Sequence, residues 1–152
     1  MSDLDTARRC ADTMYAADAA SRALGIDIEI PKAGQAIASM RVRDDMVNGF
    51  DVCHGGLIFT LADTAFAFAC NAYDRLTVAA AANIEFLKPA RRDDVLTATA
   101  VEEHRGGRSG VYSVEVLNQD DERVALFRGR SASRAEGLLQ SDTESLESGD
   151  KA

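Results

Sequence analysis

Hydrophobic and polar residues alternate along much of the chain, and two stretches replace this alternation with helical spacing. Near the start, apolar residues recur every three or four positions until Gly25, a helix stop signal, which predicts a helix over residues 3–24. The stretch CHGGLIFTLADTAFAFAC, residues 53–70, is rich in Ala, Leu and Phe and predicts a helix over residues 55–73. Apolar residues surround this second helix nearly all round, which is typical of a buried helix.

The other segments alternate with a period of two between clusters of turn-forming residues, which is typical of strands. They predict strands over residues 26–30, 35–43, 77–87, 95–104, 111–118 and 123–134. The order of helix, two strands, long helix and four strands indicates an α+β fold in which one antiparallel sheet wraps around a central helix. The last four strands, joined by short turns, are expected to form an antiparallel meander.

The 152 residues contain no internal repeat and suit a single domain. We assign this domain to residues 1–134. The remaining segment, residues 135–152, is polar, acidic and aperiodic, and we expect it to be a disordered tail.

The charge and composition of the chain exclude several classes of protein. A formal net charge of −8 argues against a general nucleic-acid binder, because phosphate contacts need clustered cations. The polar start lacks the apolar core of a signal peptide, and no apolar run reaches the roughly 18 residues of a membrane span. Three cysteines without a CxxC pair imply neither a disulfide framework nor a metal site. We therefore expect a cytoplasmic protein without metal or cofactor.

One carboxylate, Asp63, lies in the middle of the apolar helix, and no Lys or Arg occurs in residues 53–70. Burying an ionised acid without a partner costs several kcal/mol, close to the whole stability of a domain. Asp63 therefore faces a cleft containing water or has a raised pKa, and either case marks a functional site. The alternative is a solvated helix face or a pairing with a distant arginine.

The same helix begins with the sequence HGG, residues 54–56. The first amides of a helix lack intrahelical partners and carry positive character, and Gly55 and Gly56 have no Cβ to block a ligand. A carbonyl oxygen placed there would be polarised as in an oxyanion hole. Asp63 lies eight residues further on, a rise of about 12 Å. The two groups would therefore meet across a two-fold interface between subunits; the alternative is a plain helix-start turn.

Four segments together resemble one known family. NGFDVCHGGLIFTLADTAFAFACN is similar to the signature of the hotdog-fold thioesterases, and NIEFLKPARRDDVLTATA, GRSGVYSVEVLNQ and VALFRGRS are similar to their phenylacetate-degradation (PaaI-type) branch. The similarity spans about residues 44–133. It implies a helix enclosed by a sheet, subunits paired through their sheets, often as a homotetramer of two dimers, and hydrolysis of acyl-CoA thioesters at the subunit interface.

The resemblance also implies roles for five residues. Asp63 takes the place of the catalytic carboxylate, acting as a general base on water or as a nucleophile. Gly55 takes the place of the backbone donor that polarises the thioester carbonyl. Asn48 and His54 would help to position the thioester, and Thr64 would help to hold the water or Asp63.

The expected substrate is an aryl-acetyl-CoA, such as phenylacetyl-CoA or a ring-hydroxylated relative. Its phosphates need cations, and arginines of the strand-rich half are natural partners for them. The substrate-binding candidates are Gly56, Arg91, Arg92, Arg105, Arg108 and Arg128. The alternative for each arginine is an ordinary surface charge.

Two other functions fit the same fold. One is a non-catalytic domain that binds acyl-CoA. The other is an acyl-thioester dehydratase or hydratase, in which a His and a carboxylate act together across the interface; His54 and Asp63 superficially supply both groups.

Overall fold

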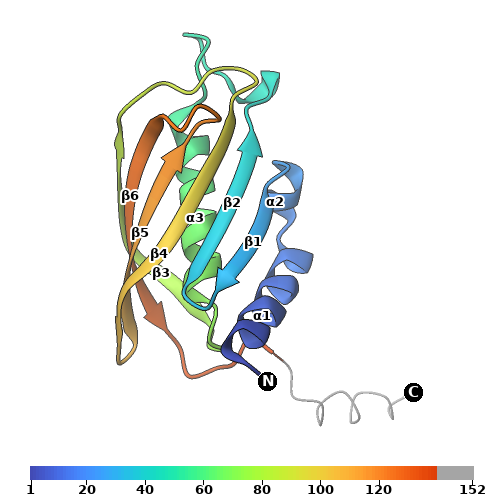
Figure 1. Cartoon of the computed structure of the whole chain (residues 1–152), viewed down its shortest axis with the longest axis vertical. Coiled ribbons are helices and arrows are strands. Elements are labelled where there is room, and N and C mark those ends of the chain that lie inside the picture. Colours follow the sequence, from blue (N-terminus) through green and yellow to red (C-terminus); the bar gives the residue numbers. More distant parts are fainter. Residues whose placement is uncertain (140–152) are drawn as a thin grey trace, which may run out of the picture.

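The computed structural model describes residues 1–139; residues 140–152, which make up most of the predicted tail, lie outside this range. The elements are α1 (Asp3–Ala17), α2 (Ala19–Ala23), β1 (Asp27–Lys32), β2 (Gln35–Arg41), the 3-10 helix η1 (Asp44–Met46), α3 (Gly55–Cys70), β3 (Thr77–Phe86), β4 (Val95–Gly106), β5 (Ser109–Leu117) and β6 (Arg123–Ser133). A single sheet curls around α3, and α1 lies along β1 (Figure 1). The predicted α+β fold with a sheet around a central helix is confirmed.

The six strands are ordered β1-β2-β4-β5-β6-β3, and all neighbours are antiparallel. β4, β5 and β6 form a meander, but the prediction that β3 belongs to it as the neighbour of β4 is wrong. β3 pairs with β6 instead, and its last residue, Phe86, lies opposite Ala125. The reason is the connection over residues 87–94, which contains Pro89, is longer than a tight hairpin turn, and leads to a position beside β2. β1 and β3 are therefore the two edges of the sheet.

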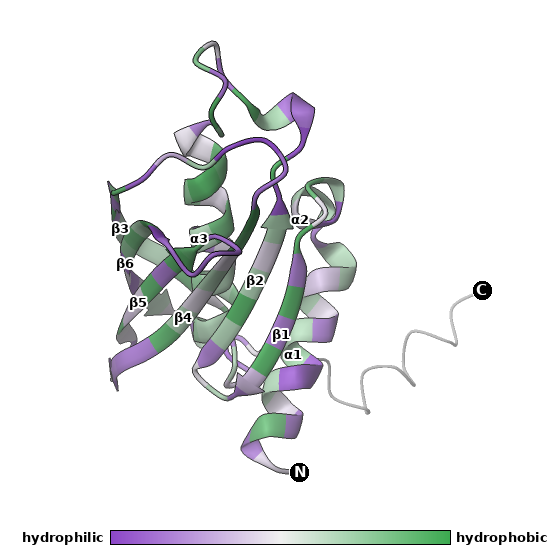
Figure 2. Ribbon diagram, turned by 45° about the horizontal axis from the view of Figure 1, so that its top comes forward, coloured by the Kyte–Doolittle hydropathy of each residue, from purple (hydrophilic) through white to green (hydrophobic). Residues whose placement is uncertain are grey.

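The core lies between the concave face of the sheet and α3. Along β5, Tyr112, Val114 and Val116 are buried and alternate with more exposed residues, as expected for a strand with one face on the core. Figure 2 shows α3 as a mostly hydrophobic helix and the strands as alternating between hydrophobic and hydrophilic positions. Phe66 of α3 packs against Tyr112 with ring centroids 5.4 Å apart. A Cβ at Gly129 would lie 2.8 Å from the Phe66 ring, so the glycine leaves room for that ring.

The predicted helix over residues 3–24 is interrupted at Asp18. This residue leaves the helical conformation, with φ −91° and ψ 84°, and ends α1. Its carboxylate accepts hydrogen bonds from the Ser21 amide (2.9 Å) and the Ser21 hydroxyl (2.6 Å), which caps α2. Short acidic side chains compete with helix continuation in this way, and the sequence pattern alone does not separate the two helices.

α3 ends at Cys70 rather than at residue 73 as predicted, because Asn71 caps the helix. Its side chain donates to the carbonyl of Thr77 and accepts from the Thr77 amide, both at 2.9 Å. Nearby, the Asp74 carboxylate accepts from the amides of Leu138 (2.9 Å) and Leu139 (2.7 Å). Residues 135–139, the start of the predicted tail, are thus held against the domain.

We expect Gly34→Ala to lower the free energy of unfolding by about 2–4 kcal/mol in a urea titration. Gly34 has φ +80°, which costs other L-residues about 1–2 kcal/mol. A Cβ there would also lie 2.7 Å from the Tyr73 hydroxyl and 2.9 Å from the Glu102 carboxylate, and such crowding costs about 1–3 kcal/mol. Gly25→Ala is the matched control, because Gly25 has φ +68° and a Cβ added there would meet no other atom of the described residues within 4 Å. Equal losses in the two variants would contradict the steric contribution.

Candidate active site

One side of α3 remains partly open in the single chain. Gly56, Thr60, Asp63 and Ala67 follow each other at four-, three- and four-residue spacing and are at least partly exposed, whereas the sheet-facing residues of the helix are buried. The small residues of this stripe look apolar in the sequence, so the helix was expected to be buried all round. The structure corrects this expectation and places Asp63 on the open side.

Asp63 is a half-buried carboxylate that has no cationic partner among residues 1–139. Within residues 1–139, none of the ion pairs involves it, and its side chain makes no hydrogen bond to another side chain. Burial raises the pKa of the Asp63 carboxyl above its usual range, because water no longer fully stabilises the charged form. A pairing with a distant arginine, the alternative interpretation of the sequence, is not found in this part of the chain.

The start of α3 is held in place by its two flanking loops. His54 is the residue before the helix, and its own amide donates to the Met46 carbonyl at 2.8 Å. The Cys53 amide donates to the Ala90 carbonyl at 2.7 Å. Within residues 1–139, the amides of Gly55 and Gly56 have no hydrogen-bond acceptor. The helix therefore presents two free donors on a fixed backbone, as the HGG sequence predicts.

Asn48 shapes the loop that leads to this helix. Its Oδ1 atom accepts hydrogen bonds from the amides of Phe50 (2.9 Å) and Val52 (3.4 Å), and its backbone amide donates to the Val52 carbonyl at 2.8 Å. The side-chain oxygen is therefore engaged in an Asx-type turn. Its NH₂ group has no acceptor within residues 1–139.

Thr64 and His54 differ in exposure and partners. Thr64 is 8% exposed, and its hydroxyl donates to the Thr60 carbonyl at 2.6 Å. The Thr64 hydroxyl is therefore used within α3 and does not donate to the Asp63 carboxylate of the same chain. The side chain of His54 is exposed and caps no helix amide.

Two of the predicted phosphate-binding arginines already have acidic partners. Arg92 forms ion pairs with Asp44 (2.8 Å) and Asp51 (2.5 Å), and these carboxylates raise the pKa of its guanidinium. Arg105 pairs with Glu102 at 3.3 Å, and its guanidinium lies 3.6 Å from the centre of the Tyr73 ring.

The five arginines do not form a single cationic patch in one chain. Arg91 lies beside the helix start, because it bridges to Val52, whereas Arg105 and Arg108 lie at the β4–β5 turn, near the opposite end of α3. Arg128 is exposed on β6, on the face of the sheet that points away from α3. Of the predicted residues, the structure gathers Asn48, His54, Gly55, Gly56 and Arg91 around the helix start.

Sequence reasoning missed one residue at this place, Phe86. A Cβ built on Gly55 would lie 3.1 Å from the Cζ atom of Phe86, so the tip of this ring touches the first residue of α3. The Phe86 side chain is nonetheless 54% exposed. An aromatic residue at the end of an edge strand was the available signal, but its contact with residue 55 depends on the pairing of β3 with β6.

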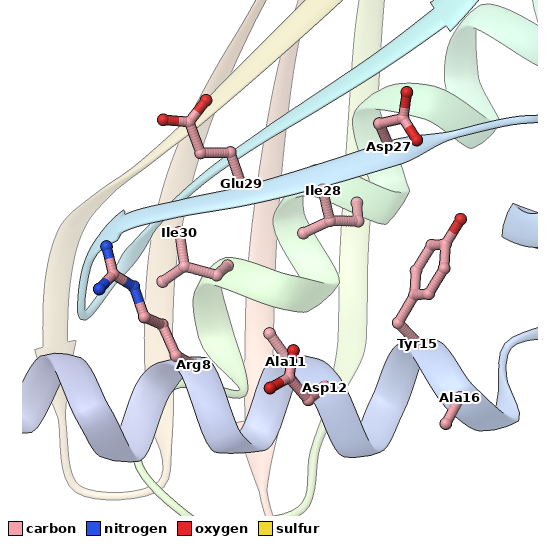
Figure 3. A pocket seen from close by; sticks show the side chains of 9 residues that line it. All are labelled: Arg8, Ala11, Asp12, Tyr15, Ala16, Asp27, Ile28, Glu29 and Ile30. Atoms are coloured by element: carbon pink, nitrogen blue, oxygen red, sulfur yellow. The ribbon is translucent and has the colours of Figure 1, made fainter.

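A cavity of about 590 Å³ lies elsewhere, between α1 and β1 (Figure 3). Its lining includes Arg8, Asp12, Tyr15, Ile28 and Glu29, and none of the predicted site residues. The Tyr15 hydroxyl donates to the Ile26 carbonyl at 2.8 Å. Among residues 1–139, no helix combines the length and apolarity needed to cross a membrane.

Comparisons with known proteins address the family directly. The sequence pattern of the thioesterase superfamily matches residues 50–125. The acyl-coenzyme A thioesterase PaaI of Escherichia coli is 50% identical over 121 residues, which make up 80% of this chain and 86% of that protein. The solved structure of the E. coli PaaI protein from the phenylacetic acid degradation operon has a TM-score of 0.87 at 46% identity, covering 90% of this chain and 99% of that one.

A more distant solved structure, from Streptococcus mutans UA159 with bound acetyl-CoA, has a TM-score of 0.70 at 26% identity, covering 74% of this chain and 90% of that one. The superfamily match begins before α3 and ends within β6, so it contains the helix start, Asp63 and Phe86. The fold and family predicted from the sequence are confirmed. This chain belongs to the thioesterase superfamily and is a hotdog-fold acyl-CoA thioesterase of the PaaI type.

Proposed function

We propose that this enzyme hydrolyses aryl-acetyl-CoA, with phenylacetyl-CoA or a ring-hydroxylated relative as substrate, to the free acid and CoA. The substrate class is supported by the E. coli relative, whose structure is described as coming from the phenylacetic acid degradation operon. The CoA part is supported by the S. mutans relative, which holds acetyl-CoA.

The observation that carries the proposed chemistry is the state of Asp63. A half-buried carboxylate without a cation in residues 1–139, whose pKa is raised by burial, is a stronger base than an exposed aspartate. Two other carboxylates, Asp44 and Asp51, differ from it because both are paired with Arg92. Asp63 is therefore suited to take a proton from water or to attack the thioester carbonyl itself.

The second element is the Gly55 amide. A thioester carbonyl oxygen that accepts its hydrogen bond gains negative charge as the tetrahedral intermediate forms, and a well-placed donor stabilises such an oxyanion by roughly 2.7–4 kcal/mol. Attack by water, with its proton passing to Asp63, followed by departure of the CoA sulfur as thiol, completes the hydrolysis. Asn48, through its NH₂ group, and His54 lie at the same helix start and would position the thioester.

The two elements come from different subunits in this proposal. In one chain, Gly55 and Asp63 are separated by eight residues of helix, about 12 Å along its axis. β3 is an edge strand with mostly exposed residues, so it offers free backbone groups for pairing with a second copy. A homodimer formed there, or a tetramer of two such dimers, would place Asp63 and the partner's helix start around one pocket, with Thr64 beside it.

Fewer of the predicted arginines are free to bind the CoA phosphates than the sequence suggests. Arg91 and Gly56 lie at the helix start, and we propose them as contacts for the part of CoA nearest the thioester. Arg108 and Arg128 are exposed at other places on the sheet and would reach CoA only from a second subunit. Arg92 and Arg105 would have to give up their acidic partners, so we assign them to loop and sheet structure.

The test is a panel of acyl-CoA substrates with detection of the released thiol. We expect kcat/KM for phenylacetyl-CoA to exceed that for straight-chain acyl-CoAs of similar size by at least about tenfold, since pocket contacts of one or two groups discriminate on this scale. A preference for straight-chain substrates would contradict the aryl-acetyl assignment. Water addition to an enoyl-CoA without thiol release would instead indicate the hydratase alternative.

A further inference from the structure

We infer that Phe86 forms a wall of the acyl pocket and sets the enzyme's preference for flat, aromatic acyl groups. This inference rests on the proposed function, because it takes the Gly55 amide as the place where the thioester carbonyl binds. It assigns a specificity-determining role to a residue outside the helix.

The position of Phe86 follows from the register of the sheet. Phe86 lies opposite Ala125, and Ile84 lies opposite Phe127. Ala125 and Phe127 are buried on the helix side of β6, so Phe86 and Ile84 also face α3. The ring tip of Phe86 then reaches Gly55, where an added Cβ would lie 3.1 Å from Cζ and 3.4 Å from Cε1.

A second aromatic side chain, Phe59, lies on α3 next to Gly55. Phe59 lies four residues after Gly55 and four before Asp63, so the three residues follow one side of α3. Phe59 is partly buried and packs against the core through an edge-to-face contact with Phe127, with ring centroids 5.3 Å apart. Phe86 differs from it because more than half of its surface is exposed. A large exposed aromatic ring whose tip lies against Gly55, the residue that carries a free helix amide, is available to contact a bound acyl group.

The chemistry of this wall favours an aryl acyl group. A phenyl ring attached to a carbonyl at the Gly55 amide would contact the face or edge of Phe86, and such aromatic pairs contribute beyond the area that they bury. An aliphatic chain gains only the burial of its surface. The ratio of kcat/KM for phenylacetyl-CoA to that for hexanoyl-CoA isolates this difference, because both substrates share the same thioester and CoA.

We expect Phe86→Leu to lower this ratio about three- to tenfold, mainly through phenylacetyl-CoA. In the same variant, phenylacetate should become a weaker inhibitor relative to hexanoate. This comparison of two free acids reports the contact with Phe86 without any turnover. Leu87→Ala is the matched control: this neighbour is 53% exposed and follows the last residue of β3, and the three atoms nearest a Cβ at Gly55 all belong to Phe86, so the ratio should stay within twofold. Melting temperatures of both variants verify folding.

The outcomes separate this inference from the proposed function. An unchanged ratio in folded Phe86→Leu, with intact hydrolysis of phenylacetyl-CoA, would overturn the role of Phe86 and leave the proposed function standing. A wild-type preference for hexanoyl-CoA would overturn the aryl-acetyl assignment. If the ratio then fell further in Phe86→Leu, the result would still place the Phe86 ring at the acyl group. An equal fall of the ratio in Leu87→Ala would also overturn the inference, because it would show a general effect of this edge.

Discussion

Replacing Asp63 with asparagine is expected to lower kcat for acyl-CoA hydrolysis by about a hundredfold to ten-thousandfold, the range that a positioned general base contributes. The amide has almost the same shape but takes no proton at neutral pH. KM should change little, because Asp63 is proposed to act on water or on the carbonyl carbon rather than on CoA. The measurement is steady-state release of free thiol. Hydrolysis within tenfold of the wild type would contradict the proposed role.

The control for this substitution is Glu103→Gln, the same change of acid to amide at an exposed residue of β4. It should keep kcat within twofold. The pH dependence gives a second check. Because burial raises the pKa of Asp63, the base is lost to protonation at a higher pH than for an exposed aspartate. On the acidic side of the pH profile, kcat/KM should therefore rise with increasing pH, and the midpoint of this rise should lie at a higher pH than the usual pKa of an aspartate.

Stability provides an independent measure of the same raised pKa. When the pKa of a carboxyl is higher in the folded than in the unfolded state, its ionised form is less well tolerated in the folded protein. The free energy of unfolding is therefore full below the unfolded-state pKa and falls as pH rises through the folded-state pKa. At neutral pH this loss of stability is fully present in the wild type and absent in Asp63→Asn. The variant should be at least as stable as the wild type at pH 7, and this advantage should vanish below the unfolded-state pKa. A variant clearly less stable at pH 7 would indicate that Asp63 has a structural partner.

The parts of the site that the sequence predicts are those decided by neighbours along the chain. The free amides of Gly55 and Gly56 follow from their place at a helix start, and the raised pKa of Asp63 follows from an apolar helix without a nearby cation. These features depend on spacing within some 16 residues of one element, α3. Local pattern and helix geometry are sufficient for them.

The features that the sequence does not reveal depend on pairing over long distances. Arg92 is 41 residues from Asp51 in sequence, and only the folded loops show that the two are bound to each other. Phe86 reaches Gly55 because β3 joins the sheet beside β6, whereas a meander of consecutive strands would have placed it elsewhere. Strand order is set by connections and burial in three dimensions, and alternation within each strand carries no information on its neighbours.

Gly55→Pro is expected to lower kcat by about a hundredfold to a thousandfold, because it removes the backbone donor proposed for the oxyanion. Proline is tolerated at the first residue of a helix, where the N–H has no intrahelical partner. The preceding residue, His54, has φ −57° and ψ 129°, a conformation that a following proline permits. The helix should therefore form as in the wild type. The melting temperature and the circular dichroism spectrum of the variant provide the check.

Gly55→Ala separates the lost donor from added bulk. Alanine keeps the N–H and places a Cβ 3.1 Å from the tip of Phe86, as the Cβ of proline also does. We expect the alanine variant to retain at least about a tenth of the wild-type kcat, because only the ring of Phe86, which is partly exposed, has to shift. Equal losses in both variants would assign the effect to Phe86. Combining each substitution with Phe86→Leu relieves that crowding, so a remaining difference between proline and alanine reports the Gly55 amide alone.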